Sequence, residues 1–330
     1  MVHSTSSDTG PDPWSDGPRT GPSAQARGSS AHGHTAGRPE TETPGGGRAD
    51  EEQSAPVPIR RPLSAAIAGF AGLLGAGLVV AAQASGPGGG RTPLALVVFG
   101  VQLLFVLAWT MAVRPPAWPV VAGLSVAVAA AADVSVVTAR VAGLAPLGYV
   151  VIAGFVAAVL SQLFRSADRK RVTESLGATL LIVVGVVAFA TLIVLNRIPV
   201  GTQAMFVCLA ASALALVIAR LTDAVLPWPR LAPQVPRGAT GVVIGAMCGT
   251  LASGVIGSYL TGFTPTSGAA VGLVAACVAV LADLAVGYAE AGRQMAGEPP
   301  TMWIARHMQG PLGGFALAAP GAYAVAVFFF

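Results

Sequence analysis

The sequence predicts an all-α fold: a polytopic membrane helix bundle of about nine transmembrane helices, preceded by a disordered N-terminal tail. Three observations support this prediction. Only 10% of the 330 residues are charged and 54% are hydrophobic, whereas soluble proteins are usually about 25% charged. Uncharged apolar runs of about 20 residues recur, and each is long enough to cross a bilayer. The runs are continuous and about twice as long as the strand of a membrane β-barrel, which favours helices over a barrel.

This composition also narrows the classes of function. A water-soluble enzyme, a nucleic-acid-binding module and a coiled coil are excluded. The net charge of +4 does not point to nucleic acid as a partner, because the cations flank apolar segments, where they set topology and contact anionic membrane lipid. Arginine outnumbers lysine 18 to one, and Ala, Gly and Val are abundant, a bias typical of GC-rich bacteria. We therefore expect a multi-pass protein of the bacterial plasma membrane.

Residues 1–60 form the first of two parts of the chain. They are rich in Gly, Pro, Ser and charged residues and contain no apolar run. Such a segment cannot bury enough apolar surface to offset the entropy of ordering, so we expect a disordered cytoplasmic tail. It lacks the apolar core of a signal peptide. Cytosolic proteins are its expected partners, and residues 61–330 are the expected transmembrane domain.

Nine apolar runs follow in order along residues 61–330. Their Gly, Ala and Val content favours close packing of helices in lipid. The expected spans are 63–84, 94–113, 119–138, 144–164, 176–196, 200–219, 239–260, 267–288 and 311–330.

The basic residues give these spans an orientation. With the tail inside, the cations from Arg60 onward divide twelve to three between the inner and outer sides. The outer three are Arg91, Arg140 and Arg197. The positive-inside rule then predicts a cytoplasmic N-terminus and an external C-terminus. The densest inner cluster is Arg165, Arg169, Lys170 and Arg171, which we expect to bind anionic lipid headgroups or a phosphate-bearing ligand.

Acidic residues inside the membrane mark functional sites by default. Asp133 and Asp283 lie well inside predicted spans, and Arg140 follows Asp133 on the same helix face as a structural partner. Asp283, with Glu290 seven residues later on the same face, is the best candidate site. No cofactor is expected on this basis. Asp283 is the one candidate metal ligand, and Mg²⁺ is implied only if the protein transfers nucleotides.

Three further features concern packing and acid–base chemistry. Gly241, Gly245 and Gly249 have the spacing of close helix packing. Pro299 and Pro300 predict the start of a short amphipathic interfacial helix. That helix would carry His307, a candidate acid or base. The three cysteines lie in apolar runs without metal-like spacing.

The C-terminal third resembles the phosphatidate cytidylyltransferase (CDP-diacylglycerol synthase) family. The resemblance rests on Ala282-Asp283-Leu284 closing an apolar helix, a polar loop, and Gly310-Pro311-Leu312-Gly313-Gly314 before a last helix with Pro320 and Tyr323. It covers about 160 residues and implies a multi-helix membrane fold with chemistry on the cytoplasmic side.

Asp283 matches the family aspartate, but several signature positions differ. Ala282 replaces a glycine, Leu312 replaces the histidine of His-Gly-Gly, and Leu317, Ala318 and Pro320 stand where the final Asp-Arg and Asp are expected. The family uses those carboxylates to hold the cation that neutralises the CTP phosphates. The resemblance therefore implies the frame of the family without its usual reaction.

Four functions are compatible with these patterns. We rank first a non-catalytic membrane protein that binds lipid or protein partners on a cytidylyltransferase-like frame. A membrane scaffold for cell division or envelope assembly comes second, a divergent CTP-dependent phospholipid-synthesis transferase third, and a transporter fourth. Convergence of Asp283, Glu290, His307 and the 165–171 cluster on one inner cavity would favour the transferase. Scattering of these residues would favour the scaffold.

Overall fold

The computed structural model describes residues 58, 60–85, 92–115, 117–163, 172–298 and 302–329. Within these ranges nine helices are long and apolar enough to cross a bilayer, which confirms the predicted fold class. The predicted tail lies outside the described residues except for Pro58 and Arg60. The helices are α1 (Arg61–Ala84), α2 (Thr92–Val113), α3 (Trp118–Thr138), α4 (Ala145–Leu163), α5 (Val172–Leu195), α6 (Gly201–Val225), α7 (Ala239–Tyr259), α8 (Pro265–Met295) and α9 (Trp303–Phe329).

The last two helices differ most from the predicted spans. Helix α8 continues to Met295, and α9 begins at Trp303 and passes through Pro311 and Pro320. The expected interfacial helix is therefore the beginning of α9 and not a separate element. Every residue from Gln309 to Ala316 is buried. This packing on all sides offsets the hydrogen bond that a proline removes from a helix.

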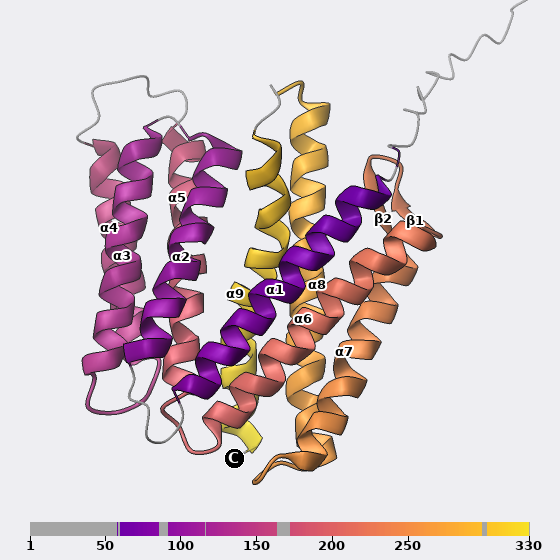
Figure 1. Cartoon of the computed structure of the whole chain (residues 1–330). Helices are drawn as coiled ribbons and strands as arrows, with labels where there is room; N and C mark the ends of the chain where they lie inside the picture. Colours follow the sequence, from indigo (N-terminus) through magenta and orange to yellow (C-terminus); the bar gives the residue numbers. More distant parts are fainter. Residues whose placement is uncertain are drawn as a thin grey trace, which may run out of the picture. The chain divides into compact units, whose positions relative to one another are not determined.

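Two groups of helices make up the bundle. Helices α2, α3, α4 and α5 pack against one another, and α6 packs against α1, α7, α8 and α9 (Figure 1). Helix α9 joins the groups because it also contacts α2 and α5. In α5, every residue from Gly185 to Leu195 is buried, so α5 and α9 supply much of the core. Helices α4 and α7 are the most exposed.

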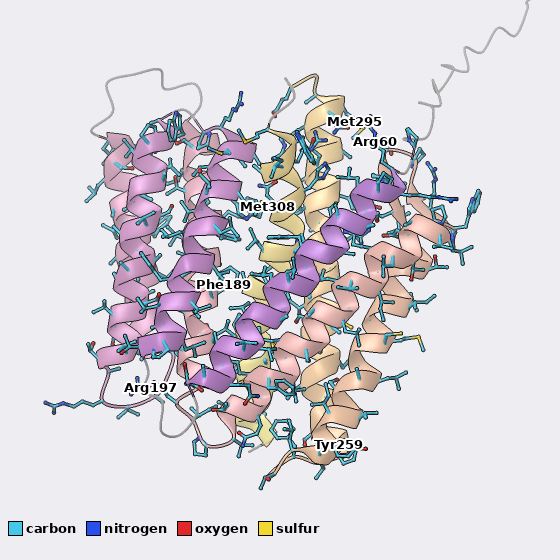
Figure 2. The ribbon with its side chains drawn as sticks, in the orientation of Figure 1. Arg60, Phe189, Arg197, Tyr259, Met295 and Met308 are labelled. Carbon is cyan, nitrogen blue, oxygen red and sulfur yellow. The ribbon has the colours of Figure 1, made fainter. Side chains whose placement is uncertain are left out.

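The bundle has two ends, which we name after residues labelled in Figure 2. Arg60 and Met295 lie at the Arg60 end, and Arg197 and Tyr259 lie at the Arg197 end. Successive helices run in opposite directions, so each connection belongs to one end of the bundle. The described cations divide eight to two between the ends. Arg140 and Arg197 belong to the Arg197 end, and the Arg60 end has Arg60, Arg61, Arg114, Arg220, Arg230, Arg237, Arg293 and Arg306.

A short hairpin joins α6 to α7, where the sequence predicted only a loop. Strand β1 (Arg230–Ala232) pairs antiparallel with β2 (Val235–Gly238). Strand β2 also contacts α6, α7 and α8. The hairpin thereby carries Arg237 into the interior of the bundle, where its side chain is only 2% exposed.

Candidate functional site

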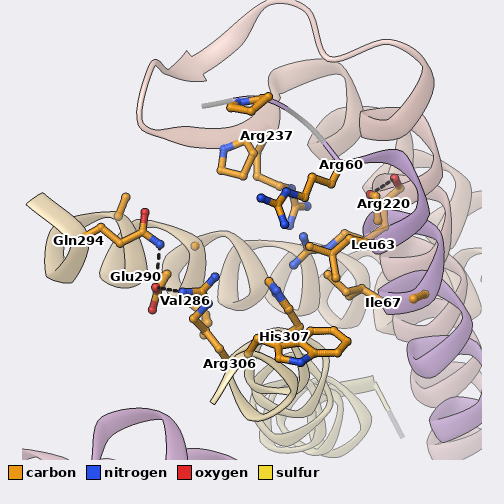
Figure 3. Close-up of a pocket in the computed structure, with 18 of the residues that line it drawn as sticks. Arg60, Leu63, Ile67, Arg220, Arg237, Val286, Glu290, Gln294, Arg306 and His307 are labelled. Carbon is orange, nitrogen blue, oxygen red and sulfur yellow. Dashed lines mark hydrogen bonds and ion pairs between the residues drawn. The ribbon is translucent and has the colours of Figure 1, made fainter. Parts of the chain in front are cut away.

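A pocket of about 830 Å³ lies at the Arg60 end. Its walls come from the start of α1, the end of α6, the hairpin, the end of α8 and the start of α9. Figure 3 shows Arg60, Arg220 and Arg237 on one side and Arg306 and His307 on the other. Four arginines and a single carboxylate, Glu290, line this Arg60-end pocket. Its surface is therefore suited to an anion.

Behind one wall of the pocket lies a buried arginine–aspartate cluster, made of Arg220, Asp223, Arg237 and Asp283. Asp283 on α8 is fully buried and accepts from Arg220 of α6. Its other oxygen, Oδ2, lies 2.5 Å from Arg237 Nη1. Arg237 Nε lies 2.6 Å from Asp223 Oδ2. Two positive and two negative charges thus balance, as buried ions require.

The local sequence explains how these four side chains meet. Arg220 and Asp223 are three residues apart on α6 and share one face of that helix. Asp223 Oδ1 also accepts from the backbone N–H of Gly238 at 2.9 Å. Gly238 is the N-cap of α7, where a negative charge is favoured by the helix dipole. This bond holds the hairpin so that Arg237 points at Asp283.

Arg237 keeps its charge and has one donor to spare. Burial alone would lower the pKa of Arg237, but the neighbouring Asp283 and Asp223 outweigh burial and raise that pKa. The Nη2 atom of Arg237 and the Nε atom of Arg220 are buried and have no hydrogen-bond acceptor. Both residues line the pocket. An unmet donor on a buried arginine is costly, so an anion close to these arginines would stabilise them.

Glu290, at the opposite side of the pocket from the cluster, is also held by cations. Its Oε1 accepts from Arg306 Nη1 at 2.7 Å and its Oε2 accepts from Arg293 Nη2 at 2.7 Å. Gln294 donates to Oε1 at 2.8 Å. One carboxylate thus fixes two arginines and an amide, and it orients Arg306 along the pocket wall.

His307 lines the pocket beside Trp303, with the ring centroids 6.0 Å apart. Trp303 is 60% exposed. Such a ring at the end of a membrane helix is typical of the headgroup region of a bilayer. The pocket thus combines cations with an aromatic wall.

Gly310 of α9 permits the close approach of α9 to Asp283. A Cβ atom at Gly310 would lie 1.9 Å from Asp283 Oδ1. Gly314, one turn later, packs against α8, where a Cβ would lie 2.9 Å from the Ala279 carbonyl oxygen. Gly310 and Gly314 therefore permit the close packing of α9 against α8 at this site.

The glycines of α7 lie against α6. A Cβ at Gly241, Gly245 or Gly249 would lie 2.3, 2.5 or 2.7 Å from the nearest atom, and each of these atoms belongs to α6. At Gly241 that atom is Asp223 Oδ1. The seam thus brings α7 close to the arginine–aspartate cluster.

The structure brings three of the predicted site residues to one end of the bundle. Glu290 and His307 line the pocket, and Asp283 lies behind Arg220 and Arg237. The predicted phosphate-binding residues Arg165, Arg169, Lys170 and Arg171 lie outside the described residues. In the described part of the chain, no group of three or more His, Cys, Asp or Glu side chains is arranged to hold a metal ion.

Two interpretations of the sequence were wrong. Asp133 does not pair with Arg140, because Gln102 binds Asp133 and Arg140 is exposed. Asp223 was placed in a loop but lies inside α6. The sequence also gave Arg220 and Arg237 only a topological role. The i,i+3 spacing of Arg220 and Asp223 was the available signal for the cluster.

No family model matches this chain, and no curated protein matches it. The resemblance to phosphatidate cytidylyltransferases therefore stays a prediction.

Proposed function

We propose that this multi-pass membrane protein binds the anionic headgroup of a membrane lipid in the Arg60-end pocket and does not transform it. The observation that carries the proposal is that four arginines and a single carboxylate line this pocket, and that the buried Nη2 of one of these arginines, Arg237, has no acceptor. A phosphate oxygen supplies the missing acceptor and a matching charge.

The walls of the pocket support a lipid as the source of that anion. Leu63, Ile67 and Val286 line the pocket together with Trp303. Apolar side chains beside cations suit a molecule whose headgroup continues into a hydrocarbon chain. The eight-to-two division of cations favours a cytoplasmic Arg60 end, so the proposed ligand belongs to the inner leaflet.

Charge neutralisation of the two carboxylates supports binding without catalysis. Asp283 is held by two arginines, and Glu290 is held by Arg293 and Arg306. A carboxylate engaged in this way stabilises the positions of arginines, and its charge is already neutralised.

Lipid titration of the purified protein tests the proposal. In an uncharged detergent, short-chain phosphatidylglycerol should raise the melting temperature, and short-chain phosphatidylcholine should not. Arg60→Gln should weaken the apparent affinity for phosphatidylglycerol roughly fivefold, because one arginine near an anionic headgroup contributes about 1 kcal/mol. Arg60 is exposed and precedes α1, so its loss should not harm the fold.

Arg140→Gln is the matched control, because Arg140 is an exposed arginine of the Arg197 end. It should bind phosphatidylglycerol like the wild type. Equal affinity in Arg60→Gln and the wild type would overturn the proposal. Glycerol phosphate, which has no acyl chain, separates the sources of the anion: stabilisation equal to that of phosphatidylglycerol would identify a soluble phosphate ligand and overturn the lipid.

One observation favours a divergent transferase as the second candidate. Glu290 and His307 line one pocket, and Asp283 lies directly behind two arginines of its wall. Purified protein supplied with CTP, Mg²⁺ and phosphatidate tests this function, with CDP-diacylglycerol as the measured product. Turnover by the wild type would establish the transferase and refute the non-catalytic proposal. The scaffold function rests on the tail and stays a prediction, as does the transporter.

A further inference from the structure

A second polar site lies in the other group of helices, apart from the Arg60-end pocket. Asp133 of α3 is buried, and Gln102, in the middle of α2, is fully buried. Gln102 Nε2 donates to Asp133 Oδ1 at 2.9 Å and to the Val186 carbonyl oxygen of α5 at 2.9 Å. A single amide group therefore connects three membrane helices.

The same two side chains leave two acceptors without a donor. Gln102 Oε1 and Asp133 Oδ2 are both buried and have no hydrogen-bond partner. The amide has already used both of its hydrogens, so it cannot satisfy either oxygen. The contact between Gln102 and Asp133 therefore lacks one hydrogen that could be shared by Gln102 Oε1 and Asp133 Oδ2.

No described cation neutralises Asp133. Helices α2, α4 and α5, which pack against α3, contain no lysine or arginine. Their titratable groups are Tyr149 on α4, which is exposed, and Glu174 near the start of α5. Beyond the end of α3, Arg140 is exposed and Arg197 donates to the carbonyl oxygens of Val136 and Ala139. Among the described residues, no ion pair includes Asp133.

We propose that Asp133 and Gln102 form a proton-binding site inside the membrane. The proton adds to Asp133 Oδ2, converts the carboxylate into a neutral acid, and is donated to Gln102 Oε1. The existing bond from Gln102 Nε2 to Asp133 Oδ1 completes a ring of two hydrogen bonds between an acid and an amide. One proton thus satisfies both acceptors and removes the charge of Asp133.

The ligand is a proton and not a metal cation because the site offers too few oxygens. Ca²⁺ and Mg²⁺ take about six or more oxygen ligands, whereas only Gln102 Oε1 and Asp133 Oδ2 lack a donor here. Gln102 already donates to Asp133 Oδ1 and to the Val186 carbonyl. Protonation keeps both of these bonds. The site is independent of the lipid pocket, and either proposal can fail alone.

Infrared spectroscopy of the protein at neutral pH tests the site. The wild type should show the C=O stretch of a protonated carboxylic acid, and Asp133→Asn should lack it. Gln102→Leu should move the band to higher frequency, because the acid loses its acceptor. Gln162→Leu, on α4, is the matched control, because Gln162 bonds to Ser175 and not to Asp133; this variant should keep the wild-type band. Absence of the band in the wild type would overturn the proposal.

A salt titration gives a second readout that needs no variant to fold. The melting temperature of the wild type should be the same in sodium, potassium and choline chloride at equal ionic strength. Stabilisation by sodium or potassium alone would identify a metal-ion site and overturn the proton. Asp133→Asn should melt close to the wild type, because asparagine is neutral and its amide can donate to Gln102 Oε1; strong destabilisation by this change would show that the site needs a charged carboxylate.

Discussion

At the residue scale, Asp283 connects the two arginines that face the Arg60-end pocket. It accepts from Arg220 of α6 and from Arg237 of β2 while lying on α8. Because it is fully buried, its charge is tolerated only while both partners are present. Arg220 and Arg237 in turn depend on Asp283, because without it they would lose a counter-charge.

We expect Asp283→Asn to destabilise the protein by about 3 kcal/mol, because two buried arginines would keep a single shared carboxylate, Asp223. Glu298→Gln removes an exposed acid near the same end and should change stability by less than about 0.5 kcal/mol. Chemical unfolding in detergent measures both changes. Equal stabilities of the two variants would show that the arginine–aspartate cluster does not contribute to folding.

A methyl group at Gly310 tests the same cluster from α9. We expect Gly310→Ala to cost about 1–3 kcal/mol, because its Cβ would lie 1.9 Å from Asp283 Oδ1. Gly292→Ala on α8 is the matched control, since nothing lies within 4 Å of a Cβ there. It should be neutral or stabilise by up to about 1 kcal/mol, as alanine favours helix. A Gly310→Ala protein that unfolds like the wild type would contradict this contact.

The sequence allowed Asp283 to be singled out, but not its partners. An acidic residue inside an apolar run is rare, so Asp283 can be recognised as a candidate without knowledge of the fold. The sequence around Arg237 is that of a polar loop between two apolar runs. Its burial depends on a hairpin that contacts three helices, and such contacts are not encoded in hydrophobic periodicity.

At the scale of elements, the seam between α6 and α7 shows how small residues replace hydrophobic burial as the basis of packing. Helix α7 is mostly exposed, yet its buried residues are all Gly or Ser. The absence of side chains lets its backbone lie on the carbonyl oxygens of Ala215 and Ala211 in α6. The spacing of the glycines was visible in the sequence, whereas the identity of the facing helix was not.

We expect Gly249→Leu to separate α7 from α6 and to lower the melting temperature, because a Cβ there would lie 2.7 Å from the Ala211 carbonyl oxygen. Gly100→Leu introduces the same side chain on α2, where a Cβ meets nothing within 4 Å, and should melt like the wild type. Thermal unfolding in detergent compares the variants. Similar melting of both variants would mean that the two helices need no close approach.

Helix boundaries were less predictable than the helices themselves. The last span was predicted to begin at Pro311, where the apolar run begins. In the structure α9 begins eight residues earlier, at Trp303. The burial of residues 309–316 on all sides decides the outcome, and burial is a property of the assembled bundle.

At the scale of the whole molecule, the number of helices determines at which end of the bundle each cation lies, and the uneven division of the cations supports that number. In the described part of the chain, nine helices place the start of α1 and the end of α9 at opposite ends of the bundle, and eight of the ten described cations belong to the Arg60 end. A miscounted helix would have mixed the two sets. The apolar runs were sufficient to predict this topology because each helix must satisfy its own backbone in lipid.

The positive-inside rule predicts that the Arg60 end faces the cytoplasm. A reporter active only in the cytoplasm should therefore function when inserted at Gly297, the exposed glycine between α8 and α9. The same reporter at Gly262, between α7 and α8, should be silent, and a reporter active only outside the membrane should show the reverse. Both glycines have positive φ, 71° and 83°, and they lie in the connections at the two ends of α8, so they form a matched pair. Activity of the cytoplasmic reporter at Gly262 and not at Gly297 would invert the topology. It would also move the proposed lipid site to the outer leaflet.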